Sequence, residues 1–183
     1  MGFWYTSTDD RDGPWHWTGV AISLAQALGL HSDPEAERKP RLKVHPAQLQ
    51  LWRNIWWTCY SHDAWLSLAL GRPMRIHATD FDTPMPAKVD QNSIDVPENI
   101  KEMYLPDGLD ELSDSWLDLL KLSRTLGRIM SGSYRSGATW MSTTDIARTE
   151  DEIRSTYRRC QERPHKRTRT VLLHLHQLHI YFE

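Results

Sequence analysis

Apolar residues recur along this chain at intervals of three and four, which is the period of an α-helix. The first such row, in 15–28, comprises Trp17, Val20, Ala21, Leu24 and Leu28. Gly13 and Pro14 precede it, and proline is favoured in the first turn of a helix. Gly29 follows it, where glycine suits a left-handed cap and Leu30 can fold back onto the last turn. These features predict a helix with one apolar face.

A longer row follows a possible start at His45-Pro46, and a helix over 46–70 would be roughly 37 Å long. Its members are Leu49, Trp52, Trp56, Cys59, Asp63, Leu66 and Leu70. Further apolar residues lie off this row: Ile55, Trp57, Ala64, Trp65 and Leu68. A helix that is apolar on more than one side is usually central, with neighbours around it. Gly71 and Pro73 predict its end.

Asp63 is a carboxylate within that apolar row. A buried and unpaired carboxylate would carry a large desolvation cost, so we expect it to be buried and paired with an arginine or with backbone amides. Arg72 and Arg75 follow the end of the helix, and Arg124 or Arg128 from another helix are alternatives.

Three more amphipathic segments follow along the chain. One contains Leu109, Leu112, Trp116, Leu119, Leu126 and Met130 and is closed by Gly132; a weaker one, 143–162, contains Ile146, Ile153, Tyr157 and Cys160; the last contains Val171, Leu172, Leu175, Leu178 and Phe182. Residues 72–108 form a long connection with five prolines, and no alternating strand pattern is evident. The pattern predicts an all-α bundle or superhelix without a significant sheet.

Composition narrows the class of function. The formal net charge is −2 and the pI is near 6.5, so the chain as a whole has no electrostatic footprint for nucleic acid. Cys59 and Cys160, the two cysteines, both lie in helical patterns and are expected to be reduced and buried. No signal sequence and no stretch of about 18 apolar residues is present, and we expect no membrane partner.

Candidate chemistry is sparse. No phosphate-binding loop, nucleophile elbow or His-Glu-x-x-His motif occurs. His176, His179 and Glu183 share one helical face, yet a solvated or interfacial face is the simpler interpretation than a zinc site that lacks a fourth ligand. His62 and Asp63 point about 100° apart on a helix and do not form a dyad. The basic segment 158–169 fits a nuclear import signal, a phosphate-contacting patch or a solvated helix end.

Three segments occur together in order: PWHWTGVAISLAQALGLHSDP (14–34), LWRNIWWTCYSHDAWLSLALGRPMRI (51–76) and DFDTPMP (80–86). They resemble the fungal-specific transcription factor domain, which is the middle regulatory region of fungal zinc binuclear cluster transcription factors, and most closely its cutinase-activator branch. The positions that match the family motifs are Trp17, Leu24, Gly29, Leu30, His31, Trp56, Trp57, Asp63, Gly71, Arg72, Pro73, Asp80 and Asp82. Ser32 and Ala64 depart from the pattern, since the family often has a basic residue at each place.

The resemblance implies an all-α regulatory domain, a nuclear location and a role in transcription by RNA polymerase II, with no catalytic activity. It also implies DNA binding through a separate module in which six cysteines hold two zinc ions. That module is missing from residues 1–183, so zinc is not expected as a cofactor of this chain. We interpret 1–183 as a single regulatory domain that is incomplete at both ends. Other transcription proteins, a second subunit or a small-molecule effector are the partners that the resemblance allows.

Two alternatives to a purely regulatory fragment remain open. In the first, Trp52, Trp56 and Trp65 line a pocket for a small-molecule inducer, whereas packing in the core is the simpler role for such rings. The second is an all-α enzyme acting on an apolar substrate, which is the weaker hypothesis because no acid, base or metal ligands converge.

Overall fold

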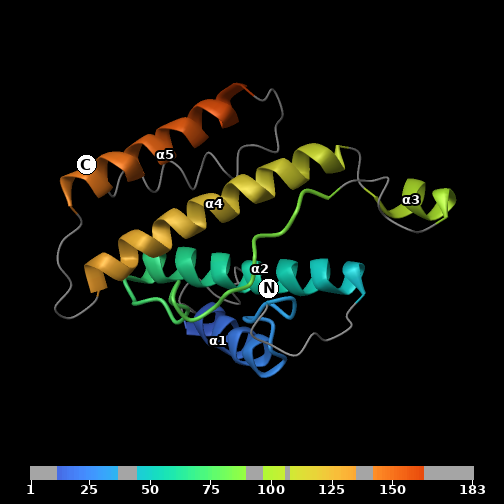
Figure 1. Ribbon diagram of the computed structural model, residues 1–183, viewed down its shortest axis with the longest axis horizontal. Helices are drawn as coiled ribbons and strands as arrows, with labels where there is room; N and C mark the ends of the chain where they lie inside the picture. The colour runs from blue at the N-terminus through green and yellow to red at the C-terminus, as the bar shows by residue number, and fades with distance from the viewer. Residues whose placement is uncertain (1–11, 37–44, 90–96, 106–107, 135–141, 163–183) are drawn as a thin grey trace. The chain divides into compact units, whose positions relative to one another are not determined.

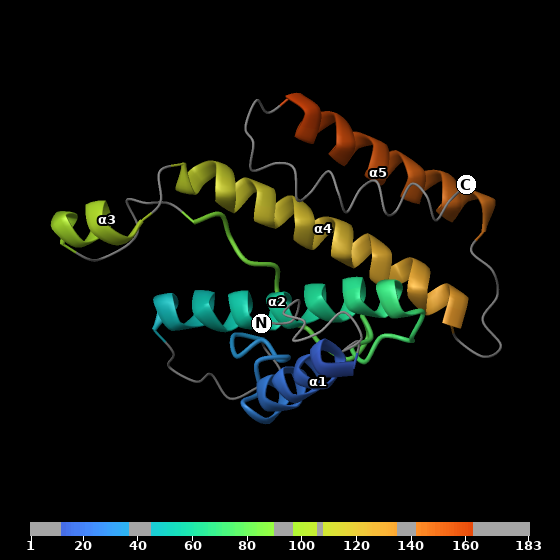
Figure 2. The same ribbon diagram turned by 180° about the vertical axis from the view of Figure 1, so that it is seen from behind.

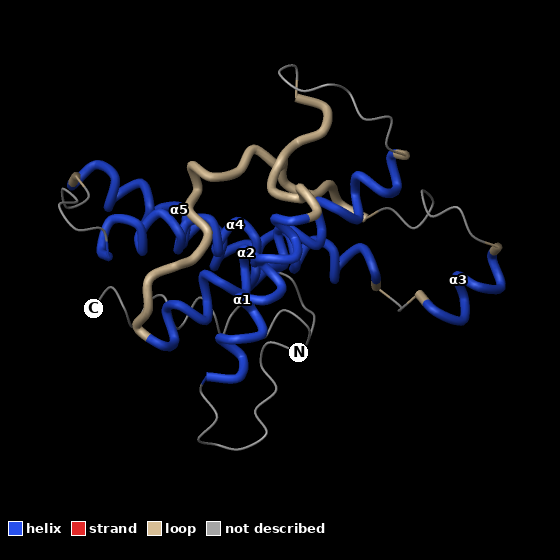
Figure 3. Tube along the Cα trace, turned by 90° about the horizontal axis from the view of Figure 1, so that it is seen from below, coloured by secondary structure: helices blue, strands red, loops and turns tan. Residues whose placement is uncertain are grey.

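All regular structure in the described part of the chain is helical. The computed structural model describes residues 12–36, 45–89, 97–105, 108–134 and 142–162. These ranges contain α1 (Asp12–Ala27), α2 (Pro46–Leu70), α3 (Glu98–Tyr104), α4 (Leu109–Tyr134) and α5 (Thr143–Glu162), shown in Figure 1. Within them the tube in Figure 3 shows helices and loops and no strand, which confirms the all-α prediction. None of the described helices combines the length and apolar character needed to cross a membrane.

The chain divides into two compact units, which are described separately here. The first unit comprises Met1–Pro86 and Ser123–Ile146, and the second comprises Ala87–Leu122 and Ala147–Glu183. Helix α4 therefore supplies its first half to the second unit and its second half to the first. That 1–183 acts as one regulatory domain stays a prediction.

Helix α2 is the centre of the first unit and has the predicted bounds. At its start the His45 Nδ1 atom accepts a hydrogen bond of 3.3 Å from the N–H of Ala47, and Pro46 occupies the first turn. At its end Gly71 takes a left-handed conformation with φ of 62°, and the N–H of Arg72 donates to the Ser67 carbonyl over 2.9 Å. Eleven of its residues are buried, as expected for a helix with neighbours on several sides.

Helix α1 packs against α2, and the two lie side by side in Figure 1 and in the reverse view of Figure 2. The predicted cap is confirmed: Gly29 has φ of 74°, and the N–H of Leu30 donates to the Ala25 carbonyl over 2.9 Å. The face toward the core differs from the row that the sequence pattern marks. Ile22 and Ala25 are each 3% exposed, whereas the row through Trp17, Leu24 and Leu28 faces outward.

The second half of α4 completes the core of the first unit. Ser123 Oγ is 2.9 Å from Ser61 Oγ on α2 and accepts a hydrogen bond of 2.9 Å from Trp65 Nε1. Leu126 and Met130 follow along this half and are buried. A Cβ atom added at Gly127 would overlap the hydroxyl oxygen of Tyr60. The contact between α2 and α4 at this position therefore has no room for a side chain, even that of alanine.

Two predicted boundaries need correction. The connection 72–108 contains a short helix, α3, which is seven residues long and below the length that periodicity detects. Helix α4 also passes through Gly132 and continues to Tyr134, because a glycine in a helix costs only about 1 kcal/mol and does not by itself end it. The segment 143–162 is α5 with the predicted bounds. The predicted segment containing Val171 and Phe182 lies outside the described residues.

Candidate functional site

Asp63 anchors the loop that follows α2. Its side chain is 0% exposed, and Oδ2 accepts hydrogen bonds of 2.8 Å from the backbone N–H groups of both Arg75 and Ile76. Oδ1 lies 3.9 Å from Nη1 of Arg75. The prediction of a buried Asp63 paired with an arginine or with backbone amides is therefore confirmed: two amides donate to it, and Arg75 is the arginine nearby. Burial raises the pKa of the Asp63 carboxyl, and the amides of Ile76 and Arg75 and the Arg75 charge offset part of this rise.

The Arg75 side chain connects this anchor to α1. Its guanidinium carbon lies 3.5 Å from the centre of the Trp15 ring, and that of Arg72 lies 5.2 Å from the same ring. A Cβ atom at Gly19 would come within 3.2 Å of the Arg75 guanidinium, so the glycine provides the space for this side chain against α1. One arginine thus contacts an aromatic ring of α1 and a carboxylate of α2, and it fixes the two helices to the same loop.

A second loop contact joins the turn after α1 to the motif at 80–86. The N–H of Asp33 donates to Asp82 Oδ1 over 2.6 Å, and the N–H of Asp82 donates to the His31 carbonyl over 3.1 Å. Thr83 Oγ1 donates to the Leu30 carbonyl over 2.7 Å. The two sequence motifs are therefore in direct contact, although about fifty residues separate them, and their polar side chains satisfy the backbone of the turn.

An aromatic cluster lies between these loops and α2. The Phe81 ring centre lies 5.5 Å from Trp56, 5.6 Å from Trp57 and 5.5 Å from Tyr60. Trp57 Nε1 donates to the Pro84 carbonyl over 2.9 Å. Burial raises the pKa of Tyr60 to about 12. These offset and edge-on contacts are typical of a packed core and not of an open ligand site.

A hollow of about 760 Å³ opens along α1 in the first unit. Eight residues of α1 between Trp15 and Gln26 line it together with Arg75, and none of the nine is acidic. The tryptophans proposed for an inducer pocket are placed elsewhere. Trp56 and Trp65 are 1% and 5% exposed within the core, Trp52 is half-buried, and their pocket role stays a prediction.

Another face of α1, the one that carries Trp17 and Leu28, is apolar and exposed. Trp17 is 63% exposed, Leu24 61% and Leu28 72%, and Ala21 between them is also exposed. Single exposed apolar residues are common on folded proteins, whereas several on one helical face form a row that is less usual. Residues 17, 21, 24 and 28 repeat at four, three and four, which is the spacing that one helix presents to another.

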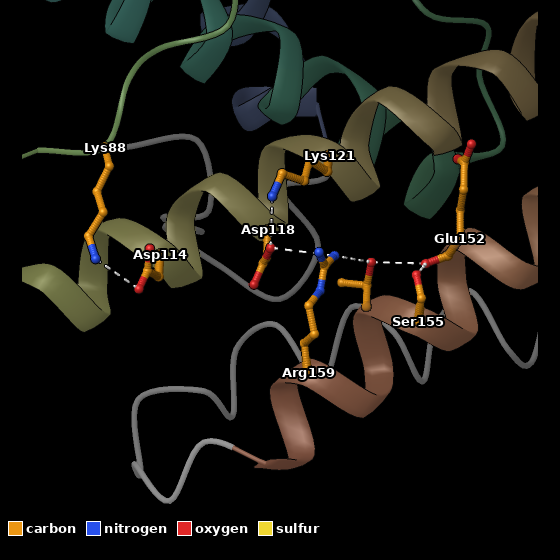
Figure 4. Close-up of polar contacts among 8 residues, drawn as sticks. Lys88, Asp114, Asp118, Lys121, Glu152, Ser155 and Arg159 are labelled. Carbon is orange, nitrogen blue, oxygen red and sulfur yellow. Dashed lines mark hydrogen bonds and ion pairs between the residues drawn. The ribbon is translucent and has the colours of Figure 1, made fainter.

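The polar contacts of the second unit hold α5 and the loop at 87–89 to the first half of α4 (Figure 4). Asp118 is buried, with Oδ1 3.3 Å from Lys121 Nζ and 3.7 Å from Arg159 Nη2. Arg159 also donates to Thr156 Oγ1 over 3.0 Å. Lys88 Nζ lies 3.1 Å from Asp114 Oδ2 in the same unit. Lys121 and Arg159 are both about half exposed. We therefore interpret their contacts with Asp118 as structural, holding α5 against α4, and not as part of a reactive site.

The motif positions fall into three groups. Those that meet around α2 and its loops are Gly29, Leu30, His31, Trp56, Trp57, Asp63, Gly71, Arg72 and Asp82. Pro73 and Asp80 are exposed on the loop after α2, where Asp80 accepts a hydrogen bond of 3.0 Å from Thr79. Trp17 and Leu24 lie on the outward face of α1.

Sequence reasoning missed the part that Trp15 and Gly19 play. Trp15 lies beside the predicted apolar row and not in it, and Gly19 matches no turn signal. Their signal is the combination of an aromatic ring and a glycine four residues apart, which is one helical turn and leaves a flat slot for a guanidinium.

Metal and catalytic interpretations find no support in the described residues. These contain no group of three or more His, Cys, Asp or Glu side chains able to hold a metal ion. The candidate zinc ligands His176, His179 and Glu183 lie outside them. Cys59 is a half-buried free thiol, and burial raises its pKa, which makes it less nucleophilic.

Comparisons with known proteins agree with these motifs. Residues 1–170 match the sequence model of the fungal specific transcription factor domain. Cutinase transcription factor 1 beta of Fusarium vanettenii is 45% identical over 85 residues, which cover 46% of this chain and 9% of that protein. Cutinase transcription factor 1 alpha of the same fungus is 30% identical over 135 residues, 73% of this chain and 14% of that protein.

A third relative is a transcription factor of Fusarium pseudograminearum, which is 30% identical over 149 residues, 76% of this chain and 16% of that protein. The chain therefore spans less than a fifth of the length of these relatives. No solved structure matches it. Because the family match covers nearly the whole chain and includes the loops that Asp63 and Asp82 hold, the chain belongs to the fungal specific transcription factor domain family.

Proposed function

We propose that this chain is the regulatory part of a fungal RNA polymerase II transcription factor and that it modulates transcription through contacts with other protein segments. The observation that carries the proposal is the family match over residues 1–170, together with relatives that are named as transcription factors. The whole protein would act in the nucleus. The chain would have no catalytic activity of its own.

DNA would be read by a different part of the protein. A binuclear zinc cluster needs six cysteines, and this chain has two, so its residues do not fit that group. The net charge of −2 also disfavours strong attraction to phosphates. Zinc and sequence-specific DNA binding therefore belong, in this proposal, to a module outside residues 1–183.

A reporter assay tests the proposal. The chain is joined to an unrelated DNA-binding module that carries an activating segment, and reporter output is compared with and without residues 1–183 at equal protein level. We expect the chain to change the output, and the folded core to be required for that change. Asp63→Ala should remove the effect, while Leu51→Ser, at an exposed position on α2, should keep it. An unchanged output from a folded, nuclear fusion would refute the proposal.

A further inference from the structure

The guanidinium of Arg75 has one edge that makes no hydrogen bond within the described part of the chain. Its Nη1 atom faces Asp63, at 3.9 Å from Oδ1. Its Nε and Nη2 atoms lie over α1, at 3.2 and 3.3 Å from where a Cβ atom of Gly19 would be, and neither donates to a described residue. We propose that this Nε and Nη2 edge binds the carboxylate of a small organic acid in the hollow along α1. The inference goes beyond the proposed function, which needs no small molecule.

The guanidinium is held in place by contacts that leave this edge open. Its carbon lies 3.5 Å from the centre of the Trp15 ring, and the backbone N–H of Arg75 donates to Asp63 Oδ2 over 2.8 Å. A side chain that is already fixed loses little conformational freedom when a ligand binds. The planar fork of a guanidinium also matches the two oxygens of a carboxylate, to which it can donate two parallel hydrogen bonds.

The charge around the hollow favours an anion. None of the nine described residues that line it is acidic, and Arg75 is one of them. Arg72 adds a second cation, at 5.2 Å from the same Trp15 ring, and Asp63 supplies one negative charge against the two arginines. Two cations and one carboxylate leave this end of the hollow positive, so a ligand with a single negative charge is complementary to it.

The rest of the hollow suits a compact apolar body attached to that carboxylate. Its volume of about 760 Å³ is in the usual range of small-molecule sites. Val20 and Leu24 line it one turn apart, about 100–140° around α1 from Gly19, so an apolar body can extend from the guanidinium toward them. His16 and Ser23 line the space between and are exposed, so a ligand can enter from solvent.

Ligand-detected NMR titrations of the full 183-residue chain test the inference. The probe is hydrocinnamate, which has one carboxylate and one phenyl ring, and the control ligand is hydrocinnamamide, which has the same body without the charge. We expect hydrocinnamate to bind with a Kd on the order of 1 mM and the amide at least about tenfold more weakly. The difference should shrink as salt is added. Inorganic phosphate, which has no apolar body, should also bind more weakly than hydrocinnamate.

Two pairs of variants locate the site. Arg75→Lys keeps a cation near Asp63 but removes the fork, and it should weaken hydrocinnamate by about tenfold, whereas Arg72→Lys should have a smaller effect. Ser23→Phe places a ring in the hollow and should abolish binding. Ala21→Phe is its matched control, because Ala21 is also exposed but lies about 160° around α1 from Ser23. Circular dichroism of all four variants should show the helix content of the unchanged chain.

Three results would overturn the inference: no binding of hydrocinnamate, equal binding of the amide or of phosphate, and equal loss of binding in Ser23→Phe and Ala21→Phe. The titration does not involve transcription, so the two proposals fail separately. A chain that modulates the reporter but binds no hydrocinnamate refutes the inference alone. A chain that binds hydrocinnamate but leaves the reporter unchanged refutes the proposed function alone.

Discussion

Replacing Asp63 with alanine tests whether this carboxylate holds the loop after α2. Alanine removes the acceptor for the backbone N–H groups of Arg75 and Ile76, and a buried donor left without a partner costs about 1–3 kcal/mol. Arg75 also loses its counter-charge, although its side chain keeps the stacking on Trp15 and is 28% exposed. We expect the free energy of unfolding to fall by about 3–5 kcal/mol.

Asp63→Asn is the matched control for this experiment. Its carbonyl oxygen can still accept from both amides, while the neutral amide group replaces the oxygen that faces Arg75, so only the ion pair is lost. We expect a net loss of less than about 1 kcal/mol, because asparagine loses a partly exposed ion pair but also removes the cost of burying a charge, the cost that raises the pKa of Asp63. The remaining difference between alanine and asparagine then measures chiefly the two amide hydrogen bonds.

Urea unfolding followed by circular dichroism measures both variants. The midpoint should move while the slope stays constant, which shows that stability changed and that the unfolded state did not. Equal stability of the alanine and asparagine variants, or a loss below about 1 kcal/mol for alanine, would contradict the argument, because the two amides would then have found other acceptors.

Four further predictions follow from the geometry. Burial raises the pKa of Asp63, so as pH rises the folded chain keeps the carboxyl proton after the unfolded chain has lost it. The free energy of unfolding, relative to that of Asp63→Asn, should therefore fall as pH rises from 3.8 to the raised pKa of the folded state and stay level above it. Urea unfolding at several pH values measures this. Lys121→Ala and Arg159→Ala should each cost less than about 1 kcal/mol, but together about 1–2 kcal/mol more than their sum, because both contact Asp118; an additive urea result would contradict this coupling. In a chain whose other cysteine, Cys160, is replaced, the Cys59 thiol should react with a disulfide reagent more slowly in the folded state than in urea, because its pKa is raised. Gel-shift titration should show only weak binding of duplex DNA without sequence preference, and a tight selective complex at physiological salt would contradict it.

The sequence predicts a structural feature well where a single residue type determines that feature for a clear physical reason. Helix α2 has the predicted bounds because Pro46 and Gly71 mark its ends. The pairing of Asp63 follows from the cost of burying a bare charge, although the identity of the arginine depends on a chain reversal that the sequence does not specify. The meeting of Asp82 with the turn at Asp33 also depends on the path of the chain and was not predicted.

The face that α1 buries could not be predicted for a different reason. Helix α1 has apolar residues on more than one side, so periodicity identifies a helix but does not show which apolar side is covered. The structure covers Ile22 and Ala25 and exposes Trp17 and Leu24. The buried hydrogen bonds of Ser123 with Ser61 and Trp65 were equally invisible, because serine in a helix pattern is usually counted as a solvent-facing residue.

Because Gly127 has no Cβ atom, the substitutions tolerated at position 127 depend on the residue at position 60, which is far away in the sequence. An alanine at 127 overlaps the hydroxyl oxygen of Tyr60 and comes within 3.1 Å of Cζ, so a phenylalanine at 60 would remove the severe overlap and leave a tight ring contact. Substitution at 60 must therefore come before substitution at 127, because the reverse order passes through an overpacked intermediate. Among related chains, alanine at the position of Gly127 should then be found beside phenylalanine, or a smaller residue, at the position of Tyr60.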